Sequence, residues 1–354
     1  LAAQKARALE EKLSGYLDSL TEEEKHNLVE RTKALEAYQE AQEDPEAARC
    51  IPMLKREDIR RKITPFTNEE QKIGDSLFLY HEVPTNGIGY LDIMFDLNDL
   101  DAEKIPYLGL LKSILGYVDT EHYTYSELTN EINAETGGIA CGIEVFEDVA
   151  STDDFRAFFG IRGKVMYPKI DILFKMIREI LNTSSLNDKK RLHEIISRVK
   201  SRSQSSLVSA GHSTAVLRAA SYSSPMAAFQ DRMAGIAYYQ FIEKLDHNFD
   251  ETAAAVIDTL KSLMAEILCP ERICFSYTGE RESLDEIRKQ CESLKNTFAS
   301  GTRDISSTPV ICQKSNEGFM TAGQVQYVAQ TGNFRKKGFQ YTGALNILKV
   351  ALSY

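Results

Sequence analysis

A long helical block set between strand patterns places the strongest constraint on how this chain can fold. Residues 167 to 268 have helical periodicity almost throughout. Strand-like segments precede this block at 139–146 and 155–166, and a short one follows it at 273–277. Strands and helices grouped in this way are typical of an α+β domain. We expect a mixed or antiparallel sheet with helices packed on one face.

Further elements are predicted upstream of these strands. Residues 73–83 and 87–97 have the pattern of two strands joined around the turn-forming run 84–87. A helix is expected after Pro106, because proline lacks an amide hydrogen and is tolerated in a first turn. The remaining predicted helices cover 126–136, 170–181, 188–207, 225–245, 251–268 and 283–298.

The opening segment has a simpler, helical pattern. Residues 2–18 form one amphipathic helix pattern, and a second runs from Thr21 to about residue 42. Thr21 and Glu24 have the spacing of a capping box, in which the hydroxyl and the carboxylate satisfy amide donors at a helix start. A hairpin of helices buries little apolar surface by itself, so we interpret this segment as a connector.

The overall charge restricts the partners that the chain can bind. The sequence has 42 Lys and Arg against 52 Asp and Glu, a formal net charge of -10. Such a surface repels phosphate backbones, so we predict no nucleic-acid partner and regard a cationic peptide as the more natural guest. No apolar run approaches the roughly 18 residues that a membrane-spanning helix needs, so no membrane partner is expected.

The cysteines indicate the redox compartment. Six of them are scattered along the chain without a CxxC pair. In a chain of this length such cysteines are typical of reduced thiols, and they do not suggest a disulfide framework. We predict a reducing compartment, a bacterial cytoplasm or, as the alternative, a mitochondrial or plastid matrix.

An ordered series of segments carries a family resemblance. The series consists of Leu108–Tyr117, Val118–Tyr125, Glu127–Asn133 and Thr136–Ile139, preceded by the helical hairpin that leads through Pro52-Met53-Leu54. Together these segments resemble the helical linker and third domain of the presequence-protease branch of the pitrilysin/insulinase metallopeptidases. The resemblance implies the LuxS/MPP-like metallohydrolase fold, preceded by a helical hairpin.

The resemblance also implies a domain organisation and partners. Family members have four homologous α+β domains arranged in pairs around a chamber, with a helical hairpin between the halves. Here residues 1–57 would be that linker, 58–300 a non-catalytic α+β domain, and 301–354 the truncated start of a further homologous domain with a strand at 321–330 and a helix at 341–353. The implied partners are the amino-terminal catalytic half of the same polypeptide and peptide substrates.

The family's zinc motif, H-x-x-E-H, has a matching place in this chain but different residues. In the motif, histidines four residues apart on a helix bind zinc, and the glutamate activates the metal-bound water. The matching positions are Tyr107, Leu110 and Leu111, and these side chains neither bind zinc nor accept a proton from water. We therefore predict no catalytic, cofactor-binding or metal-binding residue in this chain. Zinc is implied only for the full-length protein, a zinc metalloendopeptidase, and this chain alone is predicted inactive.

Two histidines invite a catalytic interpretation that the sequence does not favour. His193-Glu194 approaches H-E-x-x-H, but Ser197 replaces the second ligand, so we favour a surface pair on an amphipathic helix. Glu121-His122 lies beside tyrosines in a turn, and there we expect the histidine to hydrogen-bond backbone groups.

Two further patterns favour structural roles at least in part. The run Ser209-Ala210-Gly211-His212-Ser213 lacks the G-x-S-x-G of a nucleophile elbow, so we predict a helix break. The aromatics near the predicted strands form either core or a peptide-binding wall, and a share of each is expected; they are Tyr123, Tyr125, Phe146, Phe155, Phe158 and Phe159. An exposed sheet edge would accept an extended peptide as an added strand, although the sequence does not identify that edge.

Two other interpretations remain open at this point. The chain is alternatively a stand-alone scaffold of the same fold, similar to processing-peptidase or core subunits, without a proteolytic role. An independent hydrolase with an unrecognised site is less favoured, since no triad or metal cluster is evident. Finally, an unfinished domain at 305–354 would expose a strand, for which we expect non-native association or disorder.

Overall fold

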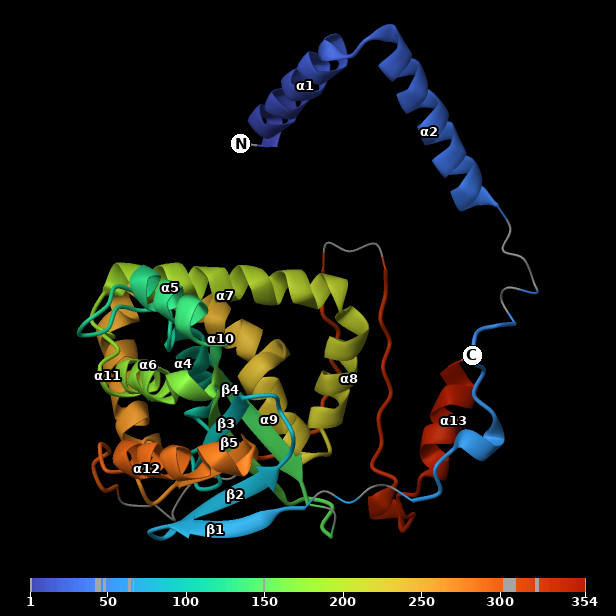
Figure 1. Cartoon of the computed structure of the whole chain (residues 1–354). Coiled ribbons are helices and arrows are strands. Elements are labelled where there is room, and N and C mark those ends of the chain that lie inside the picture. Colours follow the sequence, from blue (N-terminus) through green and yellow to red (C-terminus); the bar gives the residue numbers. More distant parts are fainter. Residues whose placement is uncertain are drawn as a thin grey trace. The chain divides into compact units, whose positions relative to one another are not determined.

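The computed structural model describes residues 2–41, 46, 49–62, 65, 67–148, 150–301, 310–321 and 325–353. The chain divides into two compact units, residues 1–65 and 66–354 (Figure 1). The divisions predicted from sequence, after residues 57 and 300, stay predictions. Along the described parts of the chain, no helix is both long enough and apolar enough to cross a membrane.

The first unit contains the predicted helices α1 (Ala2–Ser19) and α2 (Glu22–Glu40). Thr21 caps α2 as expected: its hydroxyl accepts a hydrogen bond from the Glu24 amide at 3.3 Å, and the Glu24 carboxylate accepts one from the Thr21 amide at 2.8 Å. No residue of α2 is buried, and Tyr38 is 81% exposed. A short 3-10 helix, η1 (Arg56–Asp58), follows.

The second unit is built on one six-stranded sheet, which confirms the α+β class. Its strand order is β1-β2-β6-β3-β5-β4. The β2 and β6 strands are parallel, and all other neighbours are antiparallel, so the sheet is mixed. The strands are β1 (Glu69–Ile73), β2 (Ser76–Glu82), β3 (Ile88–Asp96), β4 (Ile139–Glu147), β5 (Phe155–Met166) and β6 (Ile273–Gly279).

Two strand predictions need correction. The segment predicted as one strand at 73–83 contains the end of β1 and all of β2, because the chain turns at Gly74, whose φ of 59° is left-handed. The strands on either side of 84–87 are also not partners, since β6 lies between β2 and β3. Glu280, directly after β6, accepts hydrogen bonds from the amides of Thr85, Asn86 and Gly87, and this holds the 84–87 turn across the end of β6.

The helices of this unit confirm most predictions, with two corrections. The predicted helix at 225–245 is two helices that break at Gly235, where the Asp231 carboxylate accepts a hydrogen bond from the Ile236 amide at 3.0 Å. An extra helix, α8, lies after the predicted break at Ala210. The helices are α4 (Ile105–Ile114), α5 (Tyr125–Glu135), α6 (Ile170–Asn182), α7 (Lys189–Ser209), α8 (Gly211–Ser221), α9 (Pro225–Ala234), α10 (Ile236–His247), α11 (Phe249–Ile267) and α12 (Leu284–Lys295), with short 3-10 turns η2 (Tyr167–Lys169) and η3 (Arg281–Ser283).

One face of the sheet is covered by helices and forms the core. Alternate residues of the inner strands point to this face and are fully buried, as expected for a period of two; examples are Phe78, Leu91, Ile93, Phe159 and Phe275. Helices α4, α6 and α12 contact β4, β5 and β6 respectively from this side (Figure 1). The predicted packing of helices on one face is confirmed.

The last described segment runs over helices and forms no strand. Residues 310–321 and 325–341, which we call the strap, have no sheet partner among the described residues, so the strand predicted at 321–330 is wrong where the structure describes it. A strand needs a neighbouring strand to satisfy its backbone groups, and none of the described strands offers one here. The helix predicted at 341–353 is present as α13 (Ala344–Ser353), preceded by η4 (Arg335–Lys337). The association or disorder expected at 305–354 stays a prediction, and part of it, 305–309 and 322–324, lies outside the described residues.

Candidate functional site

The positions that match the zinc motif lie on α4, in the centre of the core. Leu110 and Leu111 are 0% and 1% exposed. Tyr107 is partly buried, and its ring packs edge-on against Phe241 with centroids 4.9 Å apart. Gly109 brings α4 so close to α9 that an added Cβ would lie 2.5 Å from the Met233 carbonyl oxygen. At these positions α4 therefore serves as a packing element.

This donor set does not fit a zinc ion. A phenol and two alkyl side chains supply none of the imidazole, thiolate or carboxylate groups that zinc binds in proteins. Within the described residues, no group of three or more His, Cys, Asp or Glu side chains is arranged to hold a metal ion. No catalytic step is accordingly assigned to this chain through a metal.

His193 on α7 belongs to a set of contacts that joins α7 to α10, whereas Glu194 pairs with Arg191 on α7 itself, at 3.2 Å. The Asp246 carboxylate of α10 accepts hydrogen bonds from the Ser197 hydroxyl at 2.5 Å and from Lys200 at 2.8 Å. His193 stacks on Phe249, with ring centroids 4.8 Å apart, and its Nε2 lies 3.4 Å from Asp246. Ser197, which stands where a second ligand would be, thus bonds a structural carboxylate.

His122 pairs with a carboxylate, so the expectation of a backbone partner is wrong. Its Nδ1 lies 2.8 Å from Oε1 of Glu179 on α6, a residue too distant in sequence to suggest the contact. Burial raises the pKa of the Glu179 carboxyl, but hydrogen bonds from Thr120, Thr183 and His122 outweigh this effect and bring the pKa below its ordinary value. The contact fastens the 119–124 loop to α6.

The serine-rich run 209–213 forms the break between α7 and α8, as predicted. Ala210 caps both helices. Gly211 lies directly under the Tyr327 ring of the strap, and an added Cβ would be 2.4 Å from that ring. Gly211 therefore permits close packing of the strap. The structure has a break between two helices at this position, and it lacks the strand-to-helix turn of a nucleophile elbow.

The second face of the sheet is not covered by helices in the way the first is, and it is chemically mixed. Its exposed apolar side chains include Tyr90 at 43%, Phe146 at 52% and Met166 at 56%. Gly142 and Gly160 are register partners, and nothing lies within 4 Å of a Cβ placed at Gly142. This surface, which we call the open face, therefore has bare backbone beside exposed aromatic groups.

Charged residues also lie on the open face. Arg162 on β5 donates a hydrogen bond to Asp92 on β3 at 2.6 Å, and it lies 3.5 Å from Glu144 on β4. These contacts raise the pKa of the Arg162 guanidinium, with the hydrogen bond to Asp92 as the largest cause. These three charged residues lie on three adjacent strands, β3, β5 and β4. Because they are far apart in the sequence, the sequence did not reveal this cluster.

A serine, a histidine and an asparagine are also brought together on this face. The Ser276 hydroxyl lies 3.2 Å from Nε2 of His81, and Nδ1 of His81 lies 2.8 Å from Oδ1 of Asn68. Nucleophilic catalysis also requires donors for an oxyanion. Because β6 is paired on both sides, the amides around Ser276 bond within the sheet, and the described residues offer no such donors here. We assign this trio a structural role.

The aromatics near the strands divide between core and exposed positions, and peptide binding by the exposed ones stays a prediction. Phe159 is fully buried, and Phe155 packs on Phe229 with centroids 5.5 Å apart. On the open face, Phe146 and Phe158 form an edge-to-face pair with centroids 6.0 Å apart. Tyr125 instead packs under the Arg191 guanidinium, and Tyr123 packs against the core.

The structure identifies the sheet edges as β1 and β4. Beside β4, the Lys164 amide donates a hydrogen bond to the Gly138 carbonyl oxygen, and the Ala157 carbonyl oxygen accepts one from the Leu97 amide, on the β3 side of β5. By the alternation of an antiparallel ladder, the backbone groups of 139, 141, 143 and 145 then point away from β5. Among the described residues none of these groups has a backbone partner. The β4 edge thus offers a row of unpaired backbone groups.

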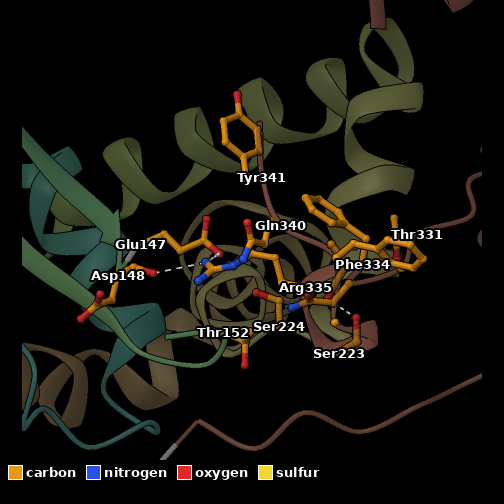
Figure 2. A pocket seen from close by; sticks show the side chains of 15 residues that line it. Glu147, Asp148, Thr152, Ser223, Ser224, Thr331, Phe334, Arg335, Gln340 and Tyr341 are labelled. Carbon is orange, nitrogen blue, oxygen red and sulfur yellow. Dashed lines mark hydrogen bonds and ion pairs between the residues drawn. The ribbon is translucent and has the colours of Figure 1, made fainter. Parts of the chain in front are cut away.

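A pocket of about 890 Å³ lies at the end of β4 (Figure 2). Its walls come from three places: Glu147, Asp148 and Thr152 at the β4–β5 loop, the α8–α9 turn, and residues 331–341 of the strap. Figure 2 shows the Arg335 side chain directed towards Glu147 and Asp148. Sequence reasoning missed this pocket, since its walls are distant in sequence.

Comparisons with known proteins agree with one family. The chain matches, over residues 1–245, the model of the family described as associated with peptidase M16, subfamily C. It is 31% identical over 350 residues to Protein HypA of Clostridium perfringens, and the alignment covers 99% of this chain and 36% of that protein. It is 25% identical over 336 residues to presequence protease 1, chloroplastic/mitochondrial, of Arabidopsis thaliana, covering 95% of this chain and 31% of that protein.

A solved structure is also similar. The peptidase M16 inactive domain from Pseudomonas fluorescens aligns with a TM-score of 0.45 and 11% identity, over 66% of this chain and 52% of that one. The present chain spans about a third of the length of the two curated relatives, 36% and 31%.

Proposed function

This chain belongs to the family associated with peptidase M16, subfamily C, and we propose that it is a non-catalytic part of a zinc-dependent endopeptidase that degrades peptides in an enclosed chamber. Membership agrees with the resemblance to the presequence-protease branch of the pitrilysin/insulinase metallopeptidases. In this proposal the chain supplies one wall of the chamber and the linker between the two halves.

The packing of α4 is the observation that carries the proposal. In this proposal α4 corresponds to the helix that bears the zinc ligands in a catalytic domain of this type, and its Leu110 and Leu111 are buried in the core. Their side chains contribute burial energy and cannot contribute metal chemistry. Zinc, the general base and the reacting groups would therefore belong to the amino-terminal catalytic half of the same polypeptide.

The open face and the β4 edge support the role of a wall. An extended peptide can bind to several features of this surface. They are the bare backbone at Gly142 and Gly160, the exposed Phe146 side chain and the unpaired backbone groups along β4. Main-chain hydrogen bonds to a strand edge bind peptides largely without regard to sequence, while neighbouring side chains add selectivity. Peptides are accordingly the proposed ligand class.

The compartment is part of the proposal as well. Relatives include a protein of the bacterium Clostridium perfringens and proteases named mitochondrial or chloroplastic. A bacterial cytoplasm fits the reduced cysteines of this chain, and an organelle matrix is the alternative.

The test has two arms. The purified 354-residue chain is analysed for zinc and assayed with a fluorogenic peptide, and we expect neither stoichiometric zinc nor turnover that a chelator abolishes. The encoding gene is then read upstream of Leu1, where H-x-x-E-H followed by a downstream glutamate is expected in the same frame. Tight zinc in the chain, or an upstream frame without the motif, would contradict the proposal.

The scaffold alternative is not favoured. The relatives from Arabidopsis thaliana and Saccharomyces cerevisiae are named proteases. A scaffold remains the interpretation to adopt if the upstream frame lacks the zinc motif.

A further inference from the structure

Asn86 is the only asparagine in the sequence that is followed by a glycine. Both residues have a positive φ, 55° for Asn86 and 81° for Gly87, and the Ile88 amide donates a hydrogen bond to the Thr85 carbonyl oxygen at 3.3 Å. These are the features of a type I′ turn, for which Asn-Gly is a preferred pair. The pair therefore has a structural role at this position.

An Asn-Gly pair is also chemically labile. The backbone nitrogen of the glycine can attack the side-chain carbonyl carbon of the asparagine, and a cyclic succinimide forms. The side-chain nitrogen takes up the amide proton and leaves as ammonia. Water then opens the ring at either carbonyl, which gives an aspartate or an isoaspartate. Glycine favours this reaction, because it has no side chain that hinders the approach and its backbone adopts many conformations.

In this structure a carboxylate binds the nitrogen that would have to attack. The Gly87 amide donates a hydrogen bond to Oε2 of Glu280 at 3.2 Å. The amides of Thr85 and Asn86 donate to Oε1 of Glu280 at 3.0 and 3.1 Å. The nitrogen attacks only after it loses its proton, and the carboxylate both binds the N–H group and repels the anion that would form. Both effects slow the closure of the ring.

Glu280 is itself held in place and kept ionised. The Tyr167 hydroxyl in η2 donates a hydrogen bond to Oε2 of Glu280 and accepts one from the Glu280 amide at 2.8 Å. The hydrogen bond from Tyr167, together with those from the turn amides, holds the pKa of the Glu280 carboxyl at about 2. Glu280 is therefore negative throughout the neutral and alkaline range, in which an amide proton is lost most readily.

Deamidation would weaken the attachment of this turn. An aspartate or isoaspartate at position 86 adds a carboxylate to a residue whose own amide is bonded to Glu280, and like charges at short range repel each other. Isoaspartate also adds one carbon to the main chain, which disturbs the hydrogen bond between Ile88 and Thr85. Because the turn joins β2 to β3 across the end of β6, the sheet would loosen at that end.

We propose that Asn86 is a site of spontaneous deamidation and that the Glu280 carboxylate protects it by binding the Gly87 amide. The reaction needs no enzyme, and water is its only co-reactant. Opening of the turn releases the Gly87 amide from Glu280, so each opening allows the ring to close. The inference does not depend on the proposed peptidase function, because it concerns one turn of the α+β unit.

The test compares deamidation rates by mass spectrometry. The 354-residue chain and a free peptide with the sequence of residues 81–92 are incubated at mildly alkaline pH, and the fragment that contains residue 86 is analysed over time. We expect the free peptide to deamidate faster than the folded chain. Glu280→Gln is expected to deamidate about tenfold faster than the unchanged chain, as for loss of one hydrogen bond to a charged acceptor. For Tyr167→Phe we expect a smaller acceleration, because the carboxylate remains but is held less firmly.

Two further variants sharpen the comparison. Glu282→Gln is the matched control, since Glu282 lies in η3 on the same segment and its substitution removes the same charge. We expect its deamidation rate to equal that of the unchanged chain. Asn86→Asp reproduces the charge of the product, and aspartate tolerates a left-handed conformation as asparagine does. We expect a lower Tm for this variant, and circular dichroism verifies that each variant retains its fold.

Two results would overturn the inference. The first is deamidation of the folded chain at the rate of the free peptide, since the turn would then give no protection. The second is the same rate in Glu280→Gln and Glu282→Gln, since the carboxylate would then not be the protecting group. If Glu280→Gln does not fold, Tyr167→Phe takes its place, and an unchanged rate in that variant also contradicts the proposal.

Discussion

The two faces of the six-stranded sheet use the same strands for different purposes. On the covered face, Leu91, Ile93 and Phe95 alternate with the open-face residues of β3 and are at most 1% exposed. On the open face of that same strand, Tyr90 is 43% exposed and Asp92 pairs with Arg162. Close packing restricts which side chains fit on the covered face, whereas the side chains on the open face remain in contact with water. Side chains on the covered face therefore determine stability, and those on the open face remain accessible from solvent.

The largest expected effect comes from α4, which packs on the covered face. Leu110→Ala removes a fully buried side chain and leaves a cavity, so we expect the free energy of unfolding to fall by about 2–5 kcal/mol. Urea denaturation followed by circular dichroism measures this change. A loss below about 1 kcal/mol would mean that α4 is not the packing element described here.

A smaller loss is expected where α4 meets α9. Gly109→Ala places a Cβ 2.5 Å from the Met233 carbonyl oxygen and 2.8 Å from the Tyr238 ring, so one of the helices must shift. Overpacking of this kind costs about 1–3 kcal/mol. The same denaturation experiment applies, with Gly142→Ala on the open face as the matched control, since nothing lies within 4 Å of a Cβ there. Equal effects of the two substitutions would contradict the difference between the faces.

Substitution of the open-face charges is expected to have little effect on stability. Arg162→Ala removes an ion pair whose members are 66% and 34% exposed, so the free energy of unfolding is expected to change by at most about 1 kcal/mol. A loss as large as that of Leu110→Ala would show that the open face is structural after all.

The smallest expected effect is local and depends on pH. Hydrogen bonds from Arg218 and Tyr222 hold the pKa of the Glu317 carboxyl at about 2, below its ordinary value of 4.5. A lowered folded-state pKa means that the contact stabilises the strap fully above the ordinary value, and that this contribution is lost as pH falls towards 2. Cleavage by a protease within residues 310–321, corrected for the protease's own pH dependence, is expected to become faster over that range. In Glu317→Gln cleavage should be faster at neutral pH and no longer vary with this titration.

Local patterns in the sequence were sufficient for much of the fold. Alternation predicted β4 and β5, and the capping pair Thr21 and Glu24 forms as expected, because both signals depend on residues that are close in sequence. That Tyr107, Leu110 and Leu111 occupy the positions of the zinc motif is likewise a prediction from the sequence, implied by the resemblance. Such features need only neighbouring residues and known spacings.

The tertiary structure alone decided which distant segments meet. The sequence did not indicate that β6 enters between β2 and β3 or that His122 pairs with Glu179, because each depends on residues packed from elsewhere in the chain. The same holds for the pocket at the end of β4, where Arg335 reaches the β4–β5 loop across a long sequence separation. The sequence by itself determined the local elements. Long-range pairing and burial, which depend on the whole packed chain, decided the edge strand, the open face and the pocket at the end of β4.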